Sequence, residues 1–262
     1  MTERVNVVVG TPVCRDKAYV LDKFLANQRE IQLVYPSSEL VLATNEADFA
    51  EELENLLNLW SLKGKVLRYE TIKPEYARSP WWNVACGREA IRRYTLSQTE
   101  AAYLLCLDVD MTFDPNVISI MEREIQGYDA VYSGYPLRDF GIALAPGGCC
   151  LLTVAVAKEI KWRCLEFKNG VAIADDVPLE MDLIRLGKRI KKGFFLSISH
   201  YDNQDQAKTI SPRPVGLYRR VTHSALVRYV LIRASIALQH DIASWLNLLI
   251  HRLLGRVRTG RT

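Results

Sequence analysis

The chain has 262 residues, of which 49% are hydrophobic and 24% are charged, and its net charge is +4. This composition is typical of a globular protein with a sizeable core, so it excludes a disordered chain and a collagen-like repeat. No apolar run reaches the roughly 18 residues that a membrane-spanning helix needs. The first residues lack the basic region, apolar segment and cleavage site of a signal peptide, so we expect the protein in the cytoplasm.

The positive charge is concentrated at the end of the chain. Residues 215–262 contain eight arginines, no lysine and one acidic residue, Asp241, which gives this segment +7 and leaves −3 for residues 1–214. We therefore divide the chain into a mildly acidic body, residues 1–214, and a basic tail, residues 215–262. The two prolines of Ser211-Pro212-Arg213-Pro214 predict a linker at residues 209–214.

The six cysteines argue against a metal ribbon or a dithiol redox centre. They contain no CxxC pair, and Cys149 and Cys150 are adjacent, so they cannot easily bridge each other. We expect reduced thiols, as is usual in the cytosol.

Short apolar runs alternate with segments of helical periodicity through the first half of the chain. Val5–Val9 is a β-branched run followed by Gly10-Thr11-Pro12, and it predicts a strand buried on both faces that ends at these three residues. The same alternation predicts strands at 39–43, 65–69 and 103–107, and helices at 18–33, 47–62 and 83–95. This order is typical of an α/β fold with a mainly parallel sheet.

The second half of the body is less regular. Its apolar runs predict strands at 130–133 and 194–199 and an apolar segment at 149–154, and its periodicity predicts a helix at 177–187. Pro146-Gly147-Gly148 predicts a loop between two of these elements.

Asp108 and Asp110 directly follow the strand predicted at 103–107. Residues i and i+2 of a strand share a face, so we expect both carboxylates to project from the carboxyl end of a buried strand, where open α/β sheets bind ligands. Two carboxylates that close repel each other unless a cation lies between them. Mg²⁺ or Mn²⁺ fits such oxygen ligands, and phosphates usually complete its shell. A solvated turn is the alternative interpretation.

Several motifs in a fixed order resemble the GT-A fold of nucleotide-sugar glycosyltransferases, family-2 type, over about residues 4–205. Asp108-Val109-Asp110 resembles the DXD motif of that family, and Asp175-Asp176 resembles its xED motif. The other similar segments are the helix from Asn83 to Ile91, the glycine loop Pro146-Gly147-Gly148, the segment from Asp175 to Ile190, and His200 in place of a C-terminal metal histidine. The chain departs from the family at Asn45-Glu46, where an Asp pair is usual, and at Glu89 and Asp175, where Asn and Glu are usual.

The resemblance implies an α/β protein with the Rossmann-like, mainly parallel sheet of the GT-A fold and a C-terminal helical extension. It further implies a metal-dependent, hexosyltransferase-like enzyme that moves a sugar from a nucleotide-sugar donor to an acceptor hydroxyl, with Mn²⁺ or Mg²⁺ as cofactor. The implied metal ligands are Asp108, Asp110 and His200. The implied donor-binding residues are Thr11, Pro12, Glu46, Arg88, Asp108, Gly147 and Gly148.

The implied catalytic residues are Asp176 and its neighbour Asp175. Asp176 is the candidate general base that takes the acceptor proton, which favours an inverting single displacement. The alternative is that the pair caps the following helix.

The tail contains an amphipathic helical pattern. One face of the predicted helix at 242–254 consists of Ile242, Trp245, Leu246, Leu249, Ile250 and Leu253. Together with the arginines, this pattern predicts attachment to an anionic membrane surface at the inner face of the membrane, where an acceptor glycan or lipid-linked acceptor would be met. A helical pair docked on the body and a homo-oligomer interface are the alternatives. We expect no nucleic-acid partner, because no base-reading motif accompanies the charge.

Two other functions stay open at the level of sequence. A nucleotidyltransferase that makes a sugar nucleotide would use a similar sheet, but it needs a glycine-rich basic loop after the first strand, and Gly10–Arg15 is a poor version of one. A non-catalytic membrane-bound scaffold with this fold is the second.

Overall fold

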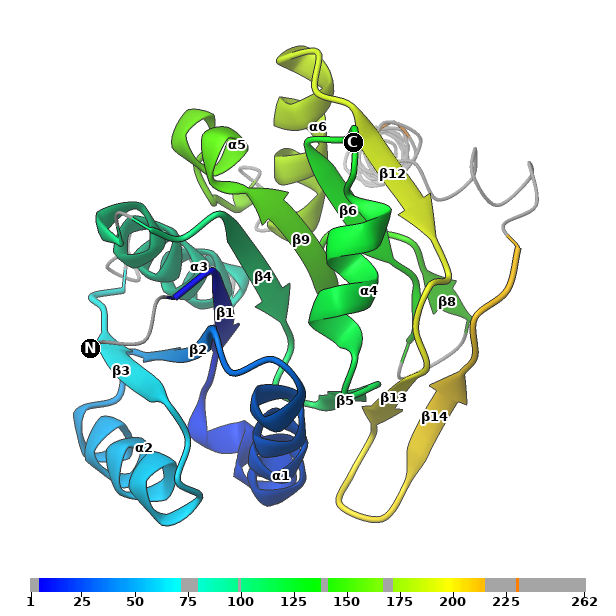
Figure 1. Ribbon diagram of the computed structural model, residues 1–262. Coiled ribbons are helices and arrows are strands. Elements are labelled where there is room, and N and C mark those ends of the chain that lie inside the picture. Colours follow the sequence, from blue (N-terminus) through cyan, green and yellow to red (C-terminus); the bar gives the residue numbers. More distant parts are fainter. Residues whose placement is uncertain are drawn as a thin grey trace, which may run out of the picture.

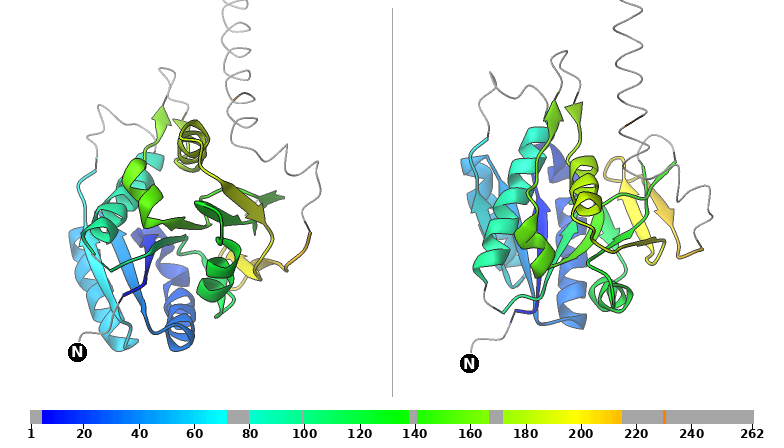
Figure 2. Two further views of the ribbon diagram at one scale, coloured as in Figure 1. Left: turned by 45° about the horizontal axis from the view of Figure 1, so that its top comes forward. Right: turned by 90° about the horizontal axis from the view of Figure 1, so that it is seen from above.

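The computed structural model of the protein describes residues 5–71, 80–98, 100–137, 141–166, 172–214 and 230. A seven-stranded sheet forms its centre, between two layers of helices (Figures 1 and 2). In spatial order its strands are β12 (Ile190–Gly193), β6 (Ala130–Ser133), β9 (Cys149–Thr153), β4 (Tyr103–Leu107), β1 (Val7–Pro12), β2 (Ser38–Thr44) and β3 (Gly64–Arg68). All neighbours are parallel except β9, which runs antiparallel to both β4 and β6. The predicted α/β fold with a mainly parallel sheet is confirmed.

Helices cover both faces of this sheet. They are α1 (Ala18–Val34), α2 (Ala47–Leu59), α3 (Trp81–Ser97), α4 (Val117–Glu124), α5 (Val154–Glu159) and α6 (Asp176–Arg185). Because successive strand residues point to opposite sides, Val7 and Val9 of β1 pack with residues of α1, α2 and α4, whereas Val8 packs with residues of α3, α5 and α6. Burial on both faces of the sheet explains why the sequence of β1 is a nearly continuous apolar run.

The strand order of the sheet changes direction at β1, and this switch point indicates where a ligand would bind. The chain builds β1, β2 and β3 outward to one side, then returns through α3 and adds β4 on the other side of β1. In open α/β sheets, ligands bind outside the carboxyl ends of strands at such a switch point. Thr11 and Pro12 end β1 at this edge, and Asp108 follows β4 there.

A second, three-stranded sheet joins the end of the body to this edge. It consists of β14 (Ala207–Ile210), β13 (Ile198–Tyr201) and β5 (Met111–Phe113), all antiparallel (Figure 1). Its register pairs His200 with Met111, and the Tyr201 amide donates to the Asp110 carbonyl at 2.9 Å. Two short hairpins, β7 (Tyr135–Pro136) with β8 (Ile142–Ala143) and β10 (Leu165–Glu166) with β11 (Ala172–Ile173), complete the strands.

Several predicted boundaries differ from the structure. Gly10, Thr11 and Pro12, which we expected to end the first strand, are its last residues, because they pair with β2 and Gly10 also pairs with β4. The strand predicted at 194–199 is wrong in its first half. Phe194 and Leu196 are buried in the core, so their apolar character reflects packing, and β13 begins only at Ile198.

The linker predicted at 209–214 is also partly wrong. Its first two residues belong to β14, and Arg213 forms a backbone bridge with Phe194. The tail predicted at 215–262 lies outside the described residues, apart from Val230.

All six cysteines are free thiols in the structure. Burial raises the pKa of the Cys106 thiol to about 12 and makes it a poor nucleophile, so this side chain contributes to the core as a small apolar group.

Within the part of the chain that the structure describes, no helix is both long enough and apolar enough to cross a membrane.

A side chain at Gly10 has no room between β1 and α3. A Cβ built there would lie 2.3 Å from Cγ2 of Ile91. We expect Gly10→Ala to lower the free energy of unfolding by about 1–3 kcal/mol, measured by chemical denaturation, because the helix must shift. In an Ile91→Ala background, which lacks this methyl group, the same substitution should cost much less. An equal cost in both backgrounds would place the strain elsewhere.

Candidate functional site

The structure brings Arg88, the predicted acidic residues, Gly147 and His200 together at the carboxyl end of β4. They come from five separate segments: α3, the turn after β4, the turn before β9, the start of α6, and β13. No two of these segments are adjacent in the sequence, so the sheet topology is what assembles the cluster.

Arg88 is the centre of the cluster. Its Nη1 donates to Oδ2 of Asp175 at 2.8 Å, and its Nη2 donates to Oδ1 of Asp108 at 2.6 Å and to the Gly147 carbonyl at 2.8 Å. The residue is only 3% exposed. Burial disfavours its charge, but the two carboxylates outweigh this effect and raise the pKa of Arg88 well above its ordinary value. Arg88 therefore stays charged and ties three parts of the site to α3.

Trp162 supports the guanidinium from one side. The Cζ atom of Arg88 lies 5.1 Å from the centroid of the Trp162 ring, which is itself buried. A desolvated cation–π contact of this kind stabilises the pair by about 2 kcal/mol. Trp162 has no sequence signal that would have identified it as part of the site.

Asp175 and Asp176 occupy the start of α6 in different ways. Asp175 holds the N-cap position, but its carboxylate is bonded to Arg88 rather than to the helix. Burial, opposed by the charge of Arg88 and reinforced by that of Asp176, raises the pKa of Asp175 to about 6. Asp176 is the first residue of the helix, is 6% exposed, and accepts a hydrogen bond on Oδ1 from the Val177 amide at 2.9 Å.

The two carboxylates of the Asp108-Val109-Asp110 sequence face different cations. Asp108 bonds to Arg88, whereas Oδ2 of Asp110 accepts a hydrogen bond from Nζ of Lys17 at 2.8 Å. The expectation that they share a strand face is wrong, because β4 ends at Leu107 and residues 109 and 110 lie in a turn. Burial raises the pKa of Asp108, whereas the Asp110 pKa falls well below its ordinary value, because bonds to His200 and Lys17 outweigh its burial.

His200 and Asp110 form a donor pair suited to a cation. His200 Nδ1 lies 2.7 Å from the Pro136 carbonyl, which can only accept, so Nδ1 is the ring nitrogen that carries a proton. A protonated Nε2 donates to Oδ2 of Asp110, 3.5 Å away, whereas in the neutral ring the same nitrogen presents a lone pair. A cation between Nε2 of His200 and Oδ2 of Asp110 would bind the lone pairs of both atoms. A neutral imidazole whose orientation is fixed by a second hydrogen bond is the usual metal-binding form.

These residues fit a divalent ion in part. Asp110 and His200 supply an oxygen and a nitrogen ligand, and the Lys17 ammonium already places a positive charge at the same carboxylate oxygen. Among the described residues, no three Asp, Glu, His or Cys side chains gather closely enough to hold an ion by themselves. Water and donor phosphates would have to complete the shell. Asp108 as a metal ligand stays a prediction.

The two loop glycines are required by close packing. A Cβ at Gly147 would lie 2.9 Å from the Tyr135 hydroxyl, and a Cβ at Gly148 would lie 2.7 Å from Cε of Met111. The Gly147 carbonyl is bonded to Arg88, so this loop is fixed against the cluster.

The other predicted donor-binding residues line the neighbouring strand ends. Thr11 is fully buried and Pro12 is half-buried at the end of β1. Glu46, just before α2, accepts a hydrogen bond from the Arg15 amide at 3.0 Å. The structure thus places these three residues at the same edge of the sheet, with Glu46 bonded to Arg15 rather than to the acidic cluster.

Lys17 was not identified from the sequence. It lies in a short 3-10 helix, η1 (Arg15–Lys17), directly after β1. A search for basic residues just beyond the carboxyl ends of the predicted strands would have found it. The Pro136 carbonyl, a backbone group, carries no such signal.

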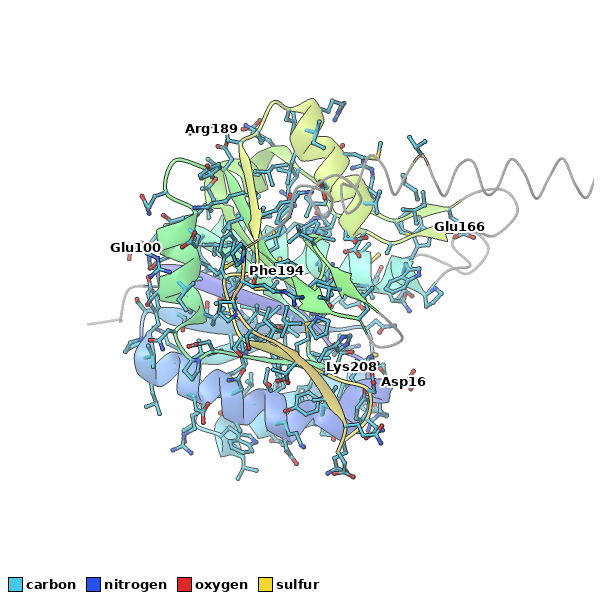
Figure 3. The ribbon with its side chains drawn as sticks, turned by 90° about the vertical axis from the view of Figure 1, so that its right-hand side faces the viewer. Asp16, Glu100, Glu166, Arg189, Phe194 and Lys208 are labelled. Carbon is cyan, nitrogen blue, oxygen red and sulfur yellow. The ribbon has the colours of Figure 1, made fainter. Side chains whose placement is uncertain are left out.

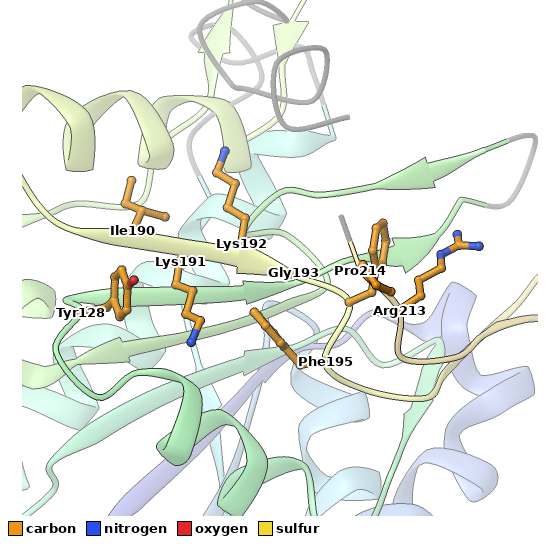
Figure 4. Close-up of a pocket in the computed structure, with 9 residues that line it drawn as sticks. Tyr128, Ile190, Lys191, Lys192, Gly193, Phe195, Arg213 and Pro214 are labelled. Carbon is orange, nitrogen blue, oxygen red and sulfur yellow. The ribbon is translucent and has the colours of Figure 1, made fainter. Parts of the chain in front are cut away.

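Two surface grooves lie outside the cluster. One, of about 610 Å³, follows the outer side of α3 and has four aromatic residues in its wall: Tyr69, Trp82, Tyr94 and Trp162. Trp82 donates at 3.0 Å to Glu166, which lies on the β10–β11 hairpin and is labelled in Figure 3. Trp81 is 46% exposed. The second groove, of about 490 Å³, lies beside the edge strand β12 (Figure 4).

Comparisons with known proteins support the fold. No family model and no curated protein matches the sequence. Residues 1–349 of S. aureus TarS, solved in complex with UDP-GlcNAc, are similar with a TM-score of 0.53 at 15% identity, over 81% of this chain and 60% of that one. A longer S. aureus TarS structure gives a TM-score of 0.50 at 14% identity, over 80% of this chain and 37% of that one.

A third solved structure is the mannosyltransferase PcManGT from Pyrobaculum calidifontis in complex with GDP-Man and Mn²⁺. Its TM-score is 0.49 at 13% identity, over 72% of this chain and 55% of that one. This chain thus spans less than two thirds of the length of each of the three. At such identities the likeness to the TarS structures concerns the fold, and on this basis the chain has the GT-A fold of nucleotide-sugar glycosyltransferases.

Proposed function

We propose that the protein is a metal-dependent glycosyltransferase that moves a sugar from a nucleotide-sugar donor to an acceptor hydroxyl. The observation that carries this proposal is the convergence on Arg88 of the Asp108–Asp110 turn, the glycine turn and the Asp175–Asp176 pair. They meet at the switch point of a sheet that has the GT-A fold. The similar TarS fragment was solved with UDP-GlcNAc, which supports a nucleotide sugar as the donor class.

The donor side of the proposed site lies at the carboxyl ends of β1 and β4. Asp110 and His200 would hold Mn²⁺ or Mg²⁺, which when bound supplies positive charge for the leaving diphosphate. Arg88 is a positioning residue, because both of its terminal nitrogens are committed to protein groups. Thr11, Pro12, Glu46, Gly147 and Gly148 would surround the nucleotide and the sugar, where the glycines allow close approach of the backbone.

The acceptor side depends on Asp176. We assign it as the general base, because Asp175 is the member of the pair that is bonded to Arg88. The acceptor hydroxyl gives its proton to Asp176 while its oxygen bonds to the anomeric carbon, and the bond from that carbon to the diphosphate oxygen breaks. A single displacement of this kind inverts the anomeric configuration.

Nucleotide binding tests the donor and metal assignments together. We expect UDP or GDP with Mn²⁺ to stabilise the wild-type protein against heat, by about 2.7 kcal/mol at a ligand concentration of 100 times Kd. Asp110→Asn removes the negative charge from the proposed ion site, so it should abolish the Mn²⁺-dependent part of this binding, measured by calorimetry.

Asp205→Asn is the matched control, because Asp205 is exposed in the turn between β13 and β14. It should bind like the wild type. If Asp110→Asn binds Mn²⁺ and nucleotide with unchanged affinity, Asp110 is not a ligand.

Asp176→Asn tests the assignment of the base. It should lower turnover by roughly 10²-fold or more with little change in donor affinity, as loss of a general base does. Release of nucleoside diphosphate from the donor measures turnover, and calorimetry measures donor affinity. A fall in donor affinity without a fall in turnover per bound donor would make Asp176 a structural or donor-binding residue.

We also propose that residues 215–262 attach the enzyme to the inner face of an anionic membrane, where a glycan or lipid-linked acceptor is reached. Arg213 and Pro214 end the described range 172–214. They line the groove beside β12 together with Lys191 and Lys192, which point to opposite sides of that strand (Figure 4). Lys191 pairs with Glu124 and Lys192 with Glu180. These two lysines already have acidic partners, so the proposal depends on the +7 charge of residues 215–262.

Truncation tests this proposal. We expect the full-length protein to co-sediment with vesicles that contain anionic lipid, less so as salt rises, because each arginine near the surface contributes about 1 kcal/mol. A chain that ends at Pro214 should stay in solution and keep its Mn²⁺-dependent nucleotide binding. If the truncated chain unfolds, or if sedimentation shows that the tail joins two copies and ignores vesicles, the membrane role is wrong.

A further inference from the structure

Lys17 occupies the carboxylate oxygen that the proposed metal ion would use. Its Nζ lies 2.8 Å from Oδ2 of Asp110, and His200 Nε2 lies 3.5 Å from the same oxygen. Lys17 stands on η1, just beyond the carboxyl end of β1. One oxygen of the acidic turn therefore has a tethered cation on one side and a metal-binding nitrogen on the other.

A divalent ion bound to this oxygen would lie too close to the Lys17 ammonium, because both are positively charged. Mg²⁺ binds carboxylate oxygens at about 2.0–2.1 Å, which would bring it within a few ångström of an ammonium in hydrogen-bond contact with the same atom. A divalent ion and an ammonium that are only a few ångström apart repel each other strongly, even at a surface-like dielectric. Occupation by the ion should therefore expel the Lys17 ammonium.

The two cations of the cluster differ in burial and in the number of groups that hold them. Arg88 is 3% exposed and holds two carboxylates and a carbonyl. The Lys17 side chain is 25% exposed, and among the described residues it forms its ion pair with Asp110. A lysine ammonium on a flexible stem changes partners easily, whereas a guanidinium fixed at several points does not.

We propose that Lys17 and the divalent ion are alternative partners of Asp110. While the ion is absent, Lys17 neutralises the carboxylate. When the ion and donor bind, the ammonium leaves Asp110 and turns to the diphosphate, whose negative charge lies at the same edge of the sheet. This inference rests on the proposed function, and it makes Lys17 a residue that weakens ion binding alone but strengthens nucleotide binding.

Binding of Mn²⁺ without nucleotide gives the first test, with free Mn²⁺ measured by electron paramagnetic resonance. We expect Lys17→Met to raise the Mn²⁺ affinity about tenfold, because a competing positive charge is gone. Lys17→Arg keeps the charge and should stay close to wild type. Lys158→Met is the control for the loss of one positive charge, because Lys158 lies on α5, at the opposite end of β9 from the cluster.

Binding of UDP or GDP at saturating Mn²⁺ gives the second test. Here the affinity of Lys17→Met should fall about tenfold, since the freed ammonium no longer meets the diphosphate. The two effects have opposite signs, and a variant that merely distorts the site would lose both affinities. Thermal unfolding checks that each variant folds, and Lys17→Gln serves as a second neutral variant.

Three outcomes overturn the exchange. If wild type binds Mn²⁺, Asp110→Asn does not, and Lys17→Met equals wild type, Lys17 does not compete, while the proposed metal site stands. If Lys17→Met and Lys17→Gln both lose Mn²⁺ affinity, Lys17 supports the site structurally. If neither wild type nor Lys17→Met binds Mn²⁺ with or without nucleotide, the metal assignment fails together with this inference.

Discussion

The buried charge of Arg88 is the constraint on which the rest of the site depends. A guanidinium taken out of water costs several kcal/mol unless hydrogen-bonded ions surround it. The chain meets this requirement with Asp108, Asp175 and the Gly147 carbonyl, so the middle of α3, the end of β4, the glycine turn and the start of α6 must stay together. Arg88, which the family resemblance implied as a donor-binding residue, thus fixes the donor side and the acceptor side of the proposed site relative to each other. Because Arg88 bonds to one aspartate from each acidic motif, both motifs must lie beside α3.

The second half of the site depends on strand register rather than on a buried charge. His200 reaches Asp110 because β13 pairs with β5, the strand that follows the acidic turn. The Pro136 carbonyl, in the β7–β8 hairpin, then sets which ring nitrogen faces Asp110. A shift of one residue in this pairing would turn the imidazole to the other face of the sheet. The two aspartates of the turn therefore depend on different interactions. Asp108 is held by its ion pair with Arg88, whereas the position of His200 beside Asp110 depends on the register between β13 and β5.

Sequence reasoning succeeded where local pattern decides the structure and failed where tertiary contacts decide it. The apolar runs at 103–107 and 130–133 coincide with β4 and β6, because a strand buried on both faces has a strong local signature. The gathering of Asp108, Asp110, Asp175, Asp176 and His200 at one edge agrees with the motif order. The divergence of the two aspartates was not predictable, since it depends on the turn that begins after Leu107 and on cations from α3 and η1. The antiparallel insertion of β9 and the core packing of Phe194 likewise have no local signal.

The charges of the cluster suggest why it would hold one immobile cation and one exchangeable cation. Asp108 and Asp175 bond to Arg88, Asp110 bonds to Lys17, and Asp176 adds a fourth acid beside Asp175. With a neutral His200, these side chains sum to −2 when all four acids are ionised. One divalent ion balances this charge. A donor diphosphate then adds negative charge to a neutral site, and a cation that can leave Asp110 is already at hand in Lys17. If Lys17 were as fixed as Arg88, the ion and the nucleotide would each have to bind against an unmatched charge. A tethered ammonium that changes partners removes this conflict, and it couples the binding of the ion to the binding of the donor.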